Sequence, residues 1–96
     1  MKKFFNVFLD GEDITVQVER YLNSGRTALQ AYDEKGMPYA MFTTNIPDAP
    51  LMEDEVILNH DIERLLPELV EQGVLRPTSK TVHSGFVDFT ICKLLV

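Results

Sequence analysis

The fold is decided by residues 25–59, which read GRTALQAYDEKGMPYAMFTTNIPDAPLMEDEVILN. Two segments of this stretch, residues 27–32 and 39–44, are predicted strands. Residues 39–44 are rich in aromatic and β-branched residues, which suit a pleated and half-buried surface. Residues 33–38 between them are acidic and contain a glycine and a proline, a composition that is typical of a turn. We therefore expect a β-hairpin in this stretch.

An acidic loop and a short strand follow the hairpin. Pro47 and Pro50 lack the backbone N–H that a β-ladder needs, so they end the second strand of the hairpin. Residues 55–58 read EVIL, and this apolar run predicts a short returning strand.

Another hairpin is predicted before residue 25. Residues 3–9 and 14–19 alternate with the period of two that strands show. The segment DGED at residues 10–13 predicts a turn, with a glycine available for positive φ. Because both faces of residues 3–9 carry apolar side chains, we expect this strand to be central in the sheet.

A helical period replaces the strand pattern after Leu58. Asn59 or Asp61 can cap the start of the predicted helix, and Gly73 is suited to end it in a left-handed conformation. Pro67 removes an intrahelical hydrogen bond, so it either kinks the helix or marks its true beginning. The apolar positions form one stripe along the helix: Ile62, Leu65, Leu66, Leu69 and Val70.

The rest of the chain is predicted to close the sheet. Residues 76–85 are polar and are expected to form a connection, and residues 86–95 alternate as a strand does. The sequence therefore predicts a single domain, residues 1–96, of the α+β class. We expect an antiparallel sheet of about five or six strands, β-meander first, with one amphipathic helix packed on a face.

Composition narrows the classes of function. The chain has 15 acidic and 9 basic residues and a net charge of -6, which favours basic protein surfaces as partners over nucleic acid or anionic membranes. No apolar run approaches the ~20 residues of a membrane span, and the start MKKFFNVFLD alternates as a strand rather than as a signal peptide. The single cysteine excludes an internal disulfide and agrees with a reducing compartment. We expect a cytoplasmic protein without direct contact to nucleic acid or membrane.

No catalytic or metal site is predicted. His60-Asp61 is a dipeptide that metal-dependent phosphohydrolases use, but only His83 remains as a further histidine, so interaction with the helix dipole is the favoured role of Asp61. His83 and Cys92 would lie about 30 Å apart along an extended strand, too far for a thiol–imidazole pair. The 5 glycines are scattered singly through turns and caps, so no phosphate-binding loop is present. We expect no enzyme, no cofactor and no metal.

Acidic residues are the best candidates for partner binding. In a meander, alternate turns share one end of the sheet, which brings one group of carboxylates together: Asp10, Glu12, Asp13, Asp33 and Glu34. A second group is expected at the opposite end, near Arg20 and Arg26: Asp48, Glu53, Asp54 and Glu55. Carboxylates two positions apart on a strand are ~6.6 Å apart, which is near the spacing of phosphates along a nucleic acid strand, so such a surface can occupy a basic groove. The alternative is a solvated acidic surface that keeps a small domain soluble.

Short motifs along the chain add a resemblance. They are Asn23 with Gly25, Ala28 with Gln30, residues 34–40, residues 44–47, Pro77-Thr78 and Ser84-Gly85-Phe86. Together they resemble a small family of domains of unknown function carried by bacterial plasmids, phages and other mobile elements. The first strand lies outside this resemblance. The resemblance implies no catalytic residue; it implies a genomic neighbourhood in which small acidic proteins often antagonise host defences.

The sequence and the resemblance together predict a non-enzymatic, mobile-element-encoded binding protein. We expect an inhibitor of a host nucleic-acid-targeting defence complex, of the anti-CRISPR or anti-restriction type, that acts through its acidic surface. The alternative is a structural or accessory protein of plasmid or phage maintenance that acts as a homodimer. Most of the aromatic rings on the strands are expected in the core, and some are expected on a sheet face that the single helix cannot cover. The rings concerned are Phe4, Phe8, Tyr21, Tyr32 and Tyr39.

Overall fold

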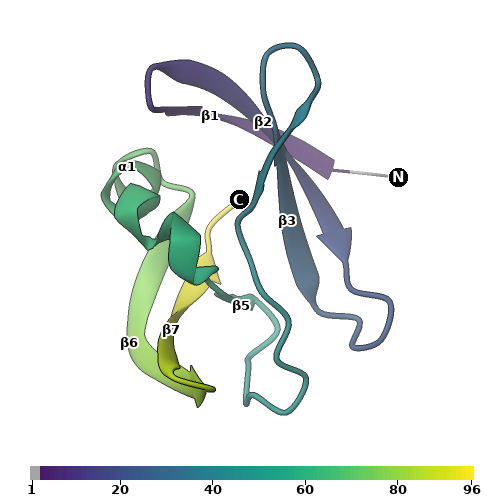
Figure 1. Cartoon of the computed structure of the whole chain (residues 1–96), viewed down its shortest axis with the longest axis vertical. Coiled ribbons are helices and arrows are strands. Elements are labelled where there is room, and N and C mark those ends of the chain that lie inside the picture. The colour runs from purple at the N-terminus through teal and green to yellow at the C-terminus, as the bar shows by residue number, and fades with distance from the viewer. Residues whose placement is uncertain (1–2) are drawn as a thin grey trace.

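Residues 3–96 are described by the computed structural model, and Met1 and Lys2 of the predicted 1–96 domain lie outside the described residues. The chain forms two antiparallel sheets and one short helical segment (Figure 1). The first sheet, in the order β1-β2-β3-β4, consists of β1 (Lys3–Leu9), β2 (Glu12–Arg20), β3 (Thr27–Tyr32) and β4 (Pro38–Met41). The second, in the order β5-β7-β6, consists of β5 (Glu55–Ile57), β7 (Val87–Leu94) and β6 (Leu75–Ser84). Between β5 and β6 lie the 3-10 helix η1 (His60–Leu65) and the α-helix α1 (Leu66–Glu71).

The first sheet is a meander whose first turn is tighter than predicted. Only Asp10 and Gly11 join β1 to β2, and their φ values are 50° and 78°. Positive φ at both central residues is the requirement of a type I′ turn, which matches the twist of paired strands and favours an Asp-Gly sequence. The acidic residues Glu12 and Asp13 therefore belong to β2 and not to the turn.

The two sheets are joined by a single bridge between Thr43 and Leu58. Next to it, the backbone N–H of Asn59 donates to the carbonyl oxygen of Phe42 at 2.9 Å. The side chain of Phe42 is fully buried, and one apolar core extends from the first sheet through the helical segment to the second sheet. The inner faces of both sheets thus share one core.

The helical segment changes type at Pro67. Oδ1 of Asn59 accepts the backbone N–H of Asp61 at 3.1 Å, so Asn59 is the cap. Residues 60–65 form the 3-10 helix η1, and α1 begins at Leu66 with the proline in its first turn, where no N–H is needed. Pro67 therefore marks the start of the α-helix rather than a kink. Gly73 ends it with a φ of 74°, as predicted.

Residues 76–85 are not the predicted polar connection, because nearly all of them belong to β6. β6 is an edge strand that pairs only with β7, so most of its side chains are exposed and no apolar alternation marks it in the sequence. A bulge between Pro77 and Thr81 interrupts its ladder, and Ser79 within it has a φ of 69°. Proline and bulges are common devices of edge strands, and they give this strand the composition of a loop.

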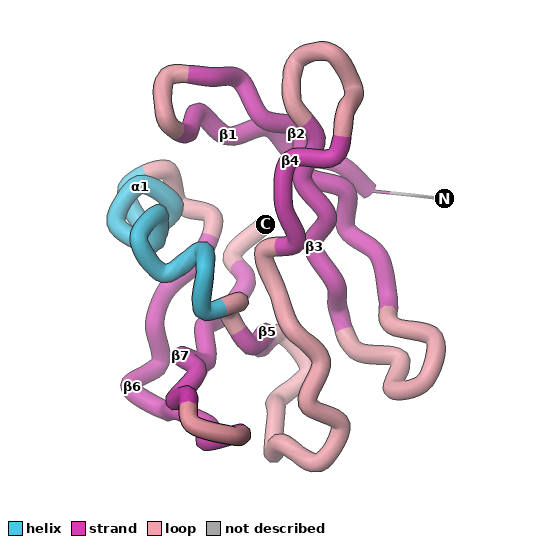
Figure 2. Tube along the Cα trace, viewed as in Figure 1, coloured by secondary structure: helices cyan, strands magenta, loops and turns pink. Residues whose placement is uncertain are grey.

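The α+β class is confirmed, but the prediction of one sheet with a helix on its face is wrong. There are two sheets, because the proline-containing loop at residues 44–54 interrupts the ladder after one bridge. The helix α1 contacts β1 of the first sheet and β6 of the second (Figure 2). It therefore packs between the two sheets on the side of the common core.

The outer face of the first sheet is left uncovered. Phe4 and Phe8 lie on this face and are 55% and 54% exposed, whereas the inward-facing Val7 and Leu9 are buried. β1 is an edge strand, so the prediction that it is central is wrong. The apolar residues on the outer face of β1 are the exposed rings of Phe4 and Phe8, and they do not pack into a second core. Within residues 3–96, no helix is long and apolar enough to cross a membrane.

Candidate functional site

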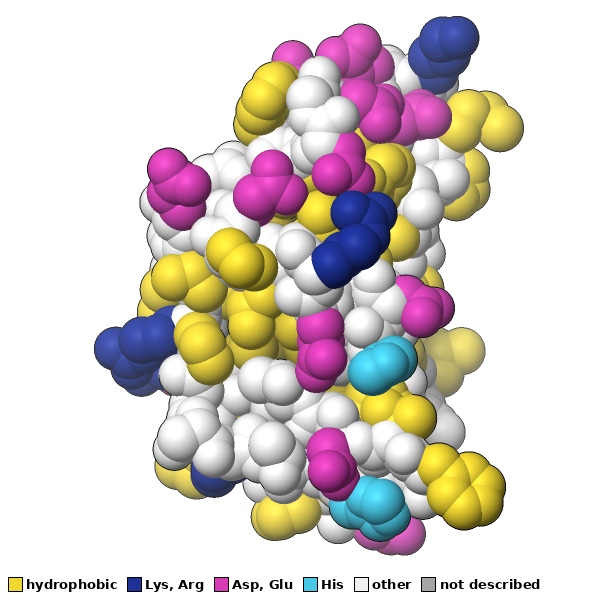
Figure 3. Space-filling model, turned by 60° about the vertical axis from the view of Figure 1, so that its left-hand side comes forward, with side chains coloured by type: hydrophobic (Ala, Val, Ile, Leu, Met, Phe, Trp, Pro, Cys, Tyr) yellow, Lys and Arg dark blue, Asp and Glu magenta, His cyan; other side chains and the backbone are white. Residues whose placement is uncertain are grey.

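The first predicted group of carboxylates lies on two neighbouring turns and on the first two residues of β2. The hydroxyl of Tyr39, just after the β3–β4 turn, donates to Oδ2 of Asp10 in the β1–β2 turn at 3.1 Å. The meander thus brings the two turns together as expected. In Figure 3, acidic side chains gather over the upper end of the molecule, where Figure 1 places these turns. We call this group the acidic end: Asp10, Glu12, Asp13, Asp33 and Glu34.

Asp10 is the most heavily engaged carboxylate of the acidic end. In addition to the hydrogen bond from Tyr39, it forms an ion pair with Arg64 of η1, with Nη1 at 3.2 Å from Oδ2. Burial and the hydrogen bond to Asp10 raise the pKa of the Tyr39 hydroxyl above its ordinary value, so this hydroxyl stays a donor. The ion pair lies at the surface and stabilises by about 1 kcal/mol or less. Asp10 mainly ties the first turn to η1 and β4.

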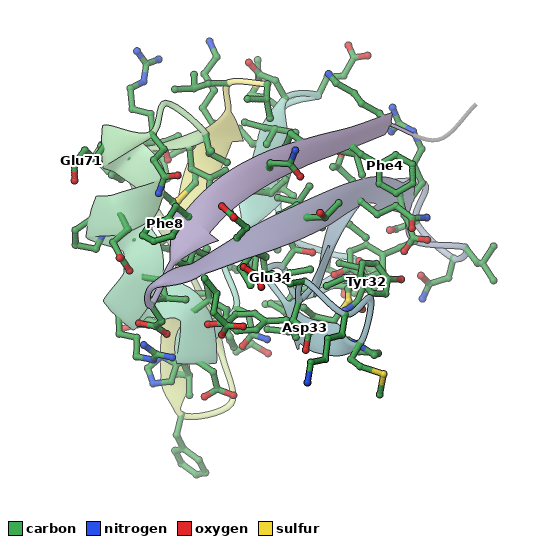
Figure 4. The ribbon with its side chains drawn as sticks, turned by 90° about the horizontal axis from the view of Figure 1, so that it is seen from above. Phe4, Phe8, Tyr32, Asp33, Glu34 and Glu71 are labelled. Atoms are coloured by element: carbon green, nitrogen blue, oxygen red, sulfur yellow. The ribbon has the colours of Figure 1, made fainter. Side chains whose placement is uncertain are left out.

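Asp33 stabilises the turn that carries it. Its Oδ1 accepts the backbone N–H groups of Lys35 and Met37, each at 2.9 Å. This pattern is typical of aspartate in turns, where the carboxylate replaces a backbone acceptor. Figure 4 shows Asp33 and Glu34 in this turn. The turn therefore holds its charges in a defined place.

The other three carboxylates of the acidic end are unpaired. Glu12, Asp13 and Glu34 take part in none of the ion pairs among residues 3–96. Asp13 and Glu34 are exposed, and Glu12 is half-buried. These three charges have no ion-pair partner among residues 3–96, so they contribute to a negative field at this end of the sheet.

Of the second predicted group, Glu53 and Glu55 lie near Arg20 and Arg26, and the four members differ in their surroundings. Arg26 donates to the backbone oxygens of Ile46 and Ala49 and so fixes the loop that precedes β5. Arg20 and Arg26 line the same shallow pocket as Glu53 and Glu55. This end therefore combines both signs of charge.

Two carboxylates of this second group stabilise the fold. Glu55 is only 8% exposed and binds Nζ of Lys80 at 2.7 Å and the backbone N–H of Met52 at 2.8 Å. These two hydrogen bonds, that from Lys80 first, hold the pKa of Glu55 below its ordinary value. Asp54 forms an ion pair with Lys93 at 3.2 Å. The exposed carboxylates without an ion pair in this group are Asp48 and Glu53.

The histidines and the cysteine do not converge. Cys92 is fully buried, and burial together with the charge of Glu63 raises the pKa of its thiol to about 11. It lies opposite Pro77 in the β6–β7 ladder, whereas His83 lies opposite Asp88, which is on the same strand as Cys92 but about 13 Å from it along β7. His83 forms an exposed pair with Asp88 at 2.7 Å. Across residues 3–96, no three histidine, cysteine or acidic side chains are grouped so that they could hold a metal ion.

Comparisons with known proteins add no relative. No protein-family model, curated protein or solved structure matches this chain. The resemblance to a family carried by mobile elements therefore stays a prediction.

A surface hollow between β1 and α1 was not foreseen from the sequence. It has a volume of about 400 Å³ and is lined by Phe8, Glu68, Glu71 and Gln72. Two features of the sequence point to part of this hollow. Phe8 is an aromatic residue on a strand that one helix cannot fully cover, and Glu68 and Glu71 lie off the apolar stripe of the helix. Their meeting depends on the packing of α1 against β1, which no local pattern encodes.

Proposed function

We propose that this chain is a non-enzymatic binding protein that recognises a basic protein surface through its acidic end. The observation that carries the proposal is that Glu12 and Asp13 at the start of β2, and Glu34 in the β3–β4 turn, take part in no ion pair among residues 3–96. The hydrogen bond between Tyr39 and Asp10 joins these two parts of the sheet end. Because the turns are fixed, the partner does not have to order these charges. Charges arranged in this way mainly raise the association rate and the selectivity for a partner.

We further propose that the partner is a nucleic-acid-targeting defence complex in the cytoplasm of a bacterial host, and that the chain inhibits it. A surface that binds nucleic-acid phosphates is basic, and the net charge of -6 gives this chain the opposite sign. The choice of a defence complex rests on the resemblance to a family carried by mobile elements. A non-enzymatic role is supported by the buried thiol of Cys92 and its distance from His83.

Affinity capture from a bacterial lysate tests the role of the acidic end. The immobilised protein is exposed to lysate at low and at raised salt, and bound proteins are identified by mass spectrometry. The test variant neutralises the three unpaired carboxylates: Glu12→Gln, Asp13→Asn and Glu34→Gln. A matched control removes three exposed carboxylates elsewhere: Asp48→Asn, Glu53→Gln and Asp61→Asn. Asp10 and Asp33 are kept, because they hold the turns in place.

We expect the native protein and the control to capture one basic, nucleic-acid-handling complex. Capture should fall as salt rises, since the Debye length shrinks from about 10 Å at 0.1 M to about 3 Å at 1 M. The test variant should associate about tenfold more slowly than the control, because steering by a charged surface contributes at least this much. Equal capture by the test variant and the control would refute the acidic end as the binding surface.

A second function, that of a homodimeric accessory protein of plasmid or phage maintenance, is supported by a different observation. Phe4 and Phe8 are exposed on the uncovered face of the first sheet, where a second copy could bury them. Light scattering on the native protein and on the Phe4→Ser, Phe8→Ser variant tests this function. A dimer that the two substitutions dissociate would support it, and a monomer at all concentrations would contradict it.

A further inference from the structure

We propose that the hollow between β1 and α1 binds an arginine side chain of the basic partner. This inference rests on the proposed function, because it names a group that the partner presents next to the acidic end. Asp13 of the acidic end lies directly across the β1–β2 ladder from Phe8, so the hollow adjoins that surface. One ligand can therefore contact both.

Gln72 fixes the two sides of the hollow relative to each other. Its Oε1 accepts the backbone N–H of Phe8 at 2.7 Å, and its Nε2 donates to the carbonyl oxygens of Phe8 at 2.8 Å and Glu68 at 3.1 Å. Both N–H groups of the amide are thereby used within the protein. Gln72 therefore positions the hollow, and the Phe8 ring and the two glutamates remain to contact a ligand.

The groups that remain fit a planar cation. The Phe8 side chain is exposed, and Glu68 and Glu71 lie three positions apart on α1 and so on neighbouring parts of the helix surface. Neither glutamate belongs to any ion pair formed by residues 3–96. Figure 4 shows Phe8 at the end of β1 beside α1, from which Glu71 projects. An exposed ring next to uncompensated carboxylates attracts a cation.

Arginine fits this hollow better than other ligands. A guanidinium group can stack its flat face on an aromatic ring while its N–H groups reach carboxylates, whereas the ammonium of lysine has no such face. An anion is disfavoured by Glu68 and Glu71. A metal ion is not supported, because no three suitable side chains are grouped within residues 3–96. The hollow thus selects a cation by shape as well as by charge.

An NMR titration with short peptides tests the proposal. The probes are acetyl-Gly-Arg-Gly-amide, its lysine counterpart and acetyl-Gly-Gly-Gly-amide. We expect the arginine peptide to shift the backbone amide resonances of Phe8 and Gln72 and the side-chain amide of Gln72. The lysine peptide should bind at least about twofold more weakly, and the glycine peptide should cause no shift.

Three variants separate the hollow from the general charge of the protein. Glu68→Gln with Glu71→Gln should weaken binding of the arginine peptide about fivefold. Phe8→Leu, which keeps an apolar side chain but removes the ring, should weaken it about two- to fivefold. The control Asp48→Asn with Glu53→Gln, which removes the same charge at the other end, should bind as the native protein does.

Equal binding of the arginine and lysine peptides, or equal weakening in the control, would overturn the proposal. Shifts confined to the turn of Asp33 and Glu34 would also overturn it, while leaving the acidic end as a binding surface. Conversely, arginine binding in the hollow without capture of a basic complex would support the site and refute the proposed function. The two proposals can thus fail separately.

Discussion

Gln72 is the side chain whose removal tests the packing of α1 against β1 most directly. It lies at the end of α1, is exposed, and makes three hydrogen bonds to backbone groups of Phe8 and Glu68. The substitution Gln72→Ala removes all three and leaves no cavity, because the side chain is at the surface. Its effect therefore reports on the hydrogen bonds and not on core packing.

The expected loss of stability for Gln72→Ala follows from these contacts. Each hydrogen bond contributes a net ~0.5 to 1.5 kcal/mol, and the lower value applies here because water can reach the released groups. Three bonds then give about 1.5 kcal/mol, from which the better helix propensity and lower side-chain entropy of alanine subtract a few tenths. A net loss of about 1 kcal/mol corresponds to a melting temperature about 4 to 8 °C lower for a domain of this size.

Urea unfolding followed by far-ultraviolet circular dichroism measures this loss, and hydrogen exchange locates it. The amide of Phe8 points away from β2 and donates to Gln72, so it should exchange much faster in Gln72→Ala than in the native protein. The control is Glu71→Ala, on the same helix, which should change stability by less than about 0.5 kcal/mol. Unchanged exchange at Phe8 in Gln72→Ala would refute the reasoning.

Two further predictions concern buried or half-buried groups. The thiol of Cys92 should not react with a thiol reagent at pH 8 in the folded protein and should react fully in urea, because it is buried and its pKa is raised to about 11; rapid reaction of the native protein would contradict this. Lys80→Met should destabilise the protein at pH 7 and should flatten its loss of stability in acid. The hydrogen bond from Lys80 is the main cause of the lowered pKa of Glu55. The stabilisation that the ionised Glu55 contributes is therefore fully present above pH 4.5, the ordinary pKa of the carboxyl group, and is lost as the pH falls through the lowered pKa of the folded state. Urea midpoints at pH 7, 5 and 3 check this, and parallel pH profiles for the two proteins would show that the pair contributes nothing.

The predictable part of the fold is the part in which alternation reflects burial on one face. Residues 3–9 and 27–32 were predicted as strands and correspond to β1 and β3. β6 was not predicted as a strand, because most side chains of this edge strand are exposed and its sequence therefore shows no apolar alternation. The division into two sheets was missed for a related reason, since a single bridge at Thr43 and Leu58 has no sequence signature.

The candidate site also has a part that the sequence predicts and a part that it does not. That the turns of Asp10 and Asp33 share one end follows from the meander alone, so the sequence could predict it. The ion pair between Asp10 and Arg64, and that between Glu55 and Lys80, join residues far apart in the chain. Which carboxylates are neutralised, and which remain free for a partner, is therefore decided by tertiary packing.

The arrangement around Phe8 disfavours one mode of self-association, which is strand pairing along the whole edge of β1. Gln72 already occupies the outward backbone groups of Phe8, so strand pairing at the edge of β1 would have to stop before this residue or displace Gln72. On the outer face, the cross-strand neighbour of Phe8 is Asp13, a carboxylate without an ion pair among residues 3–96 that a basic partner of the proposed kind would compensate. Like charges that meet at an interface cost free energy, whereas opposite charges add to the association rate. The contacts of Phe8 with Gln72 thus weigh against self-association through the full edge of β1.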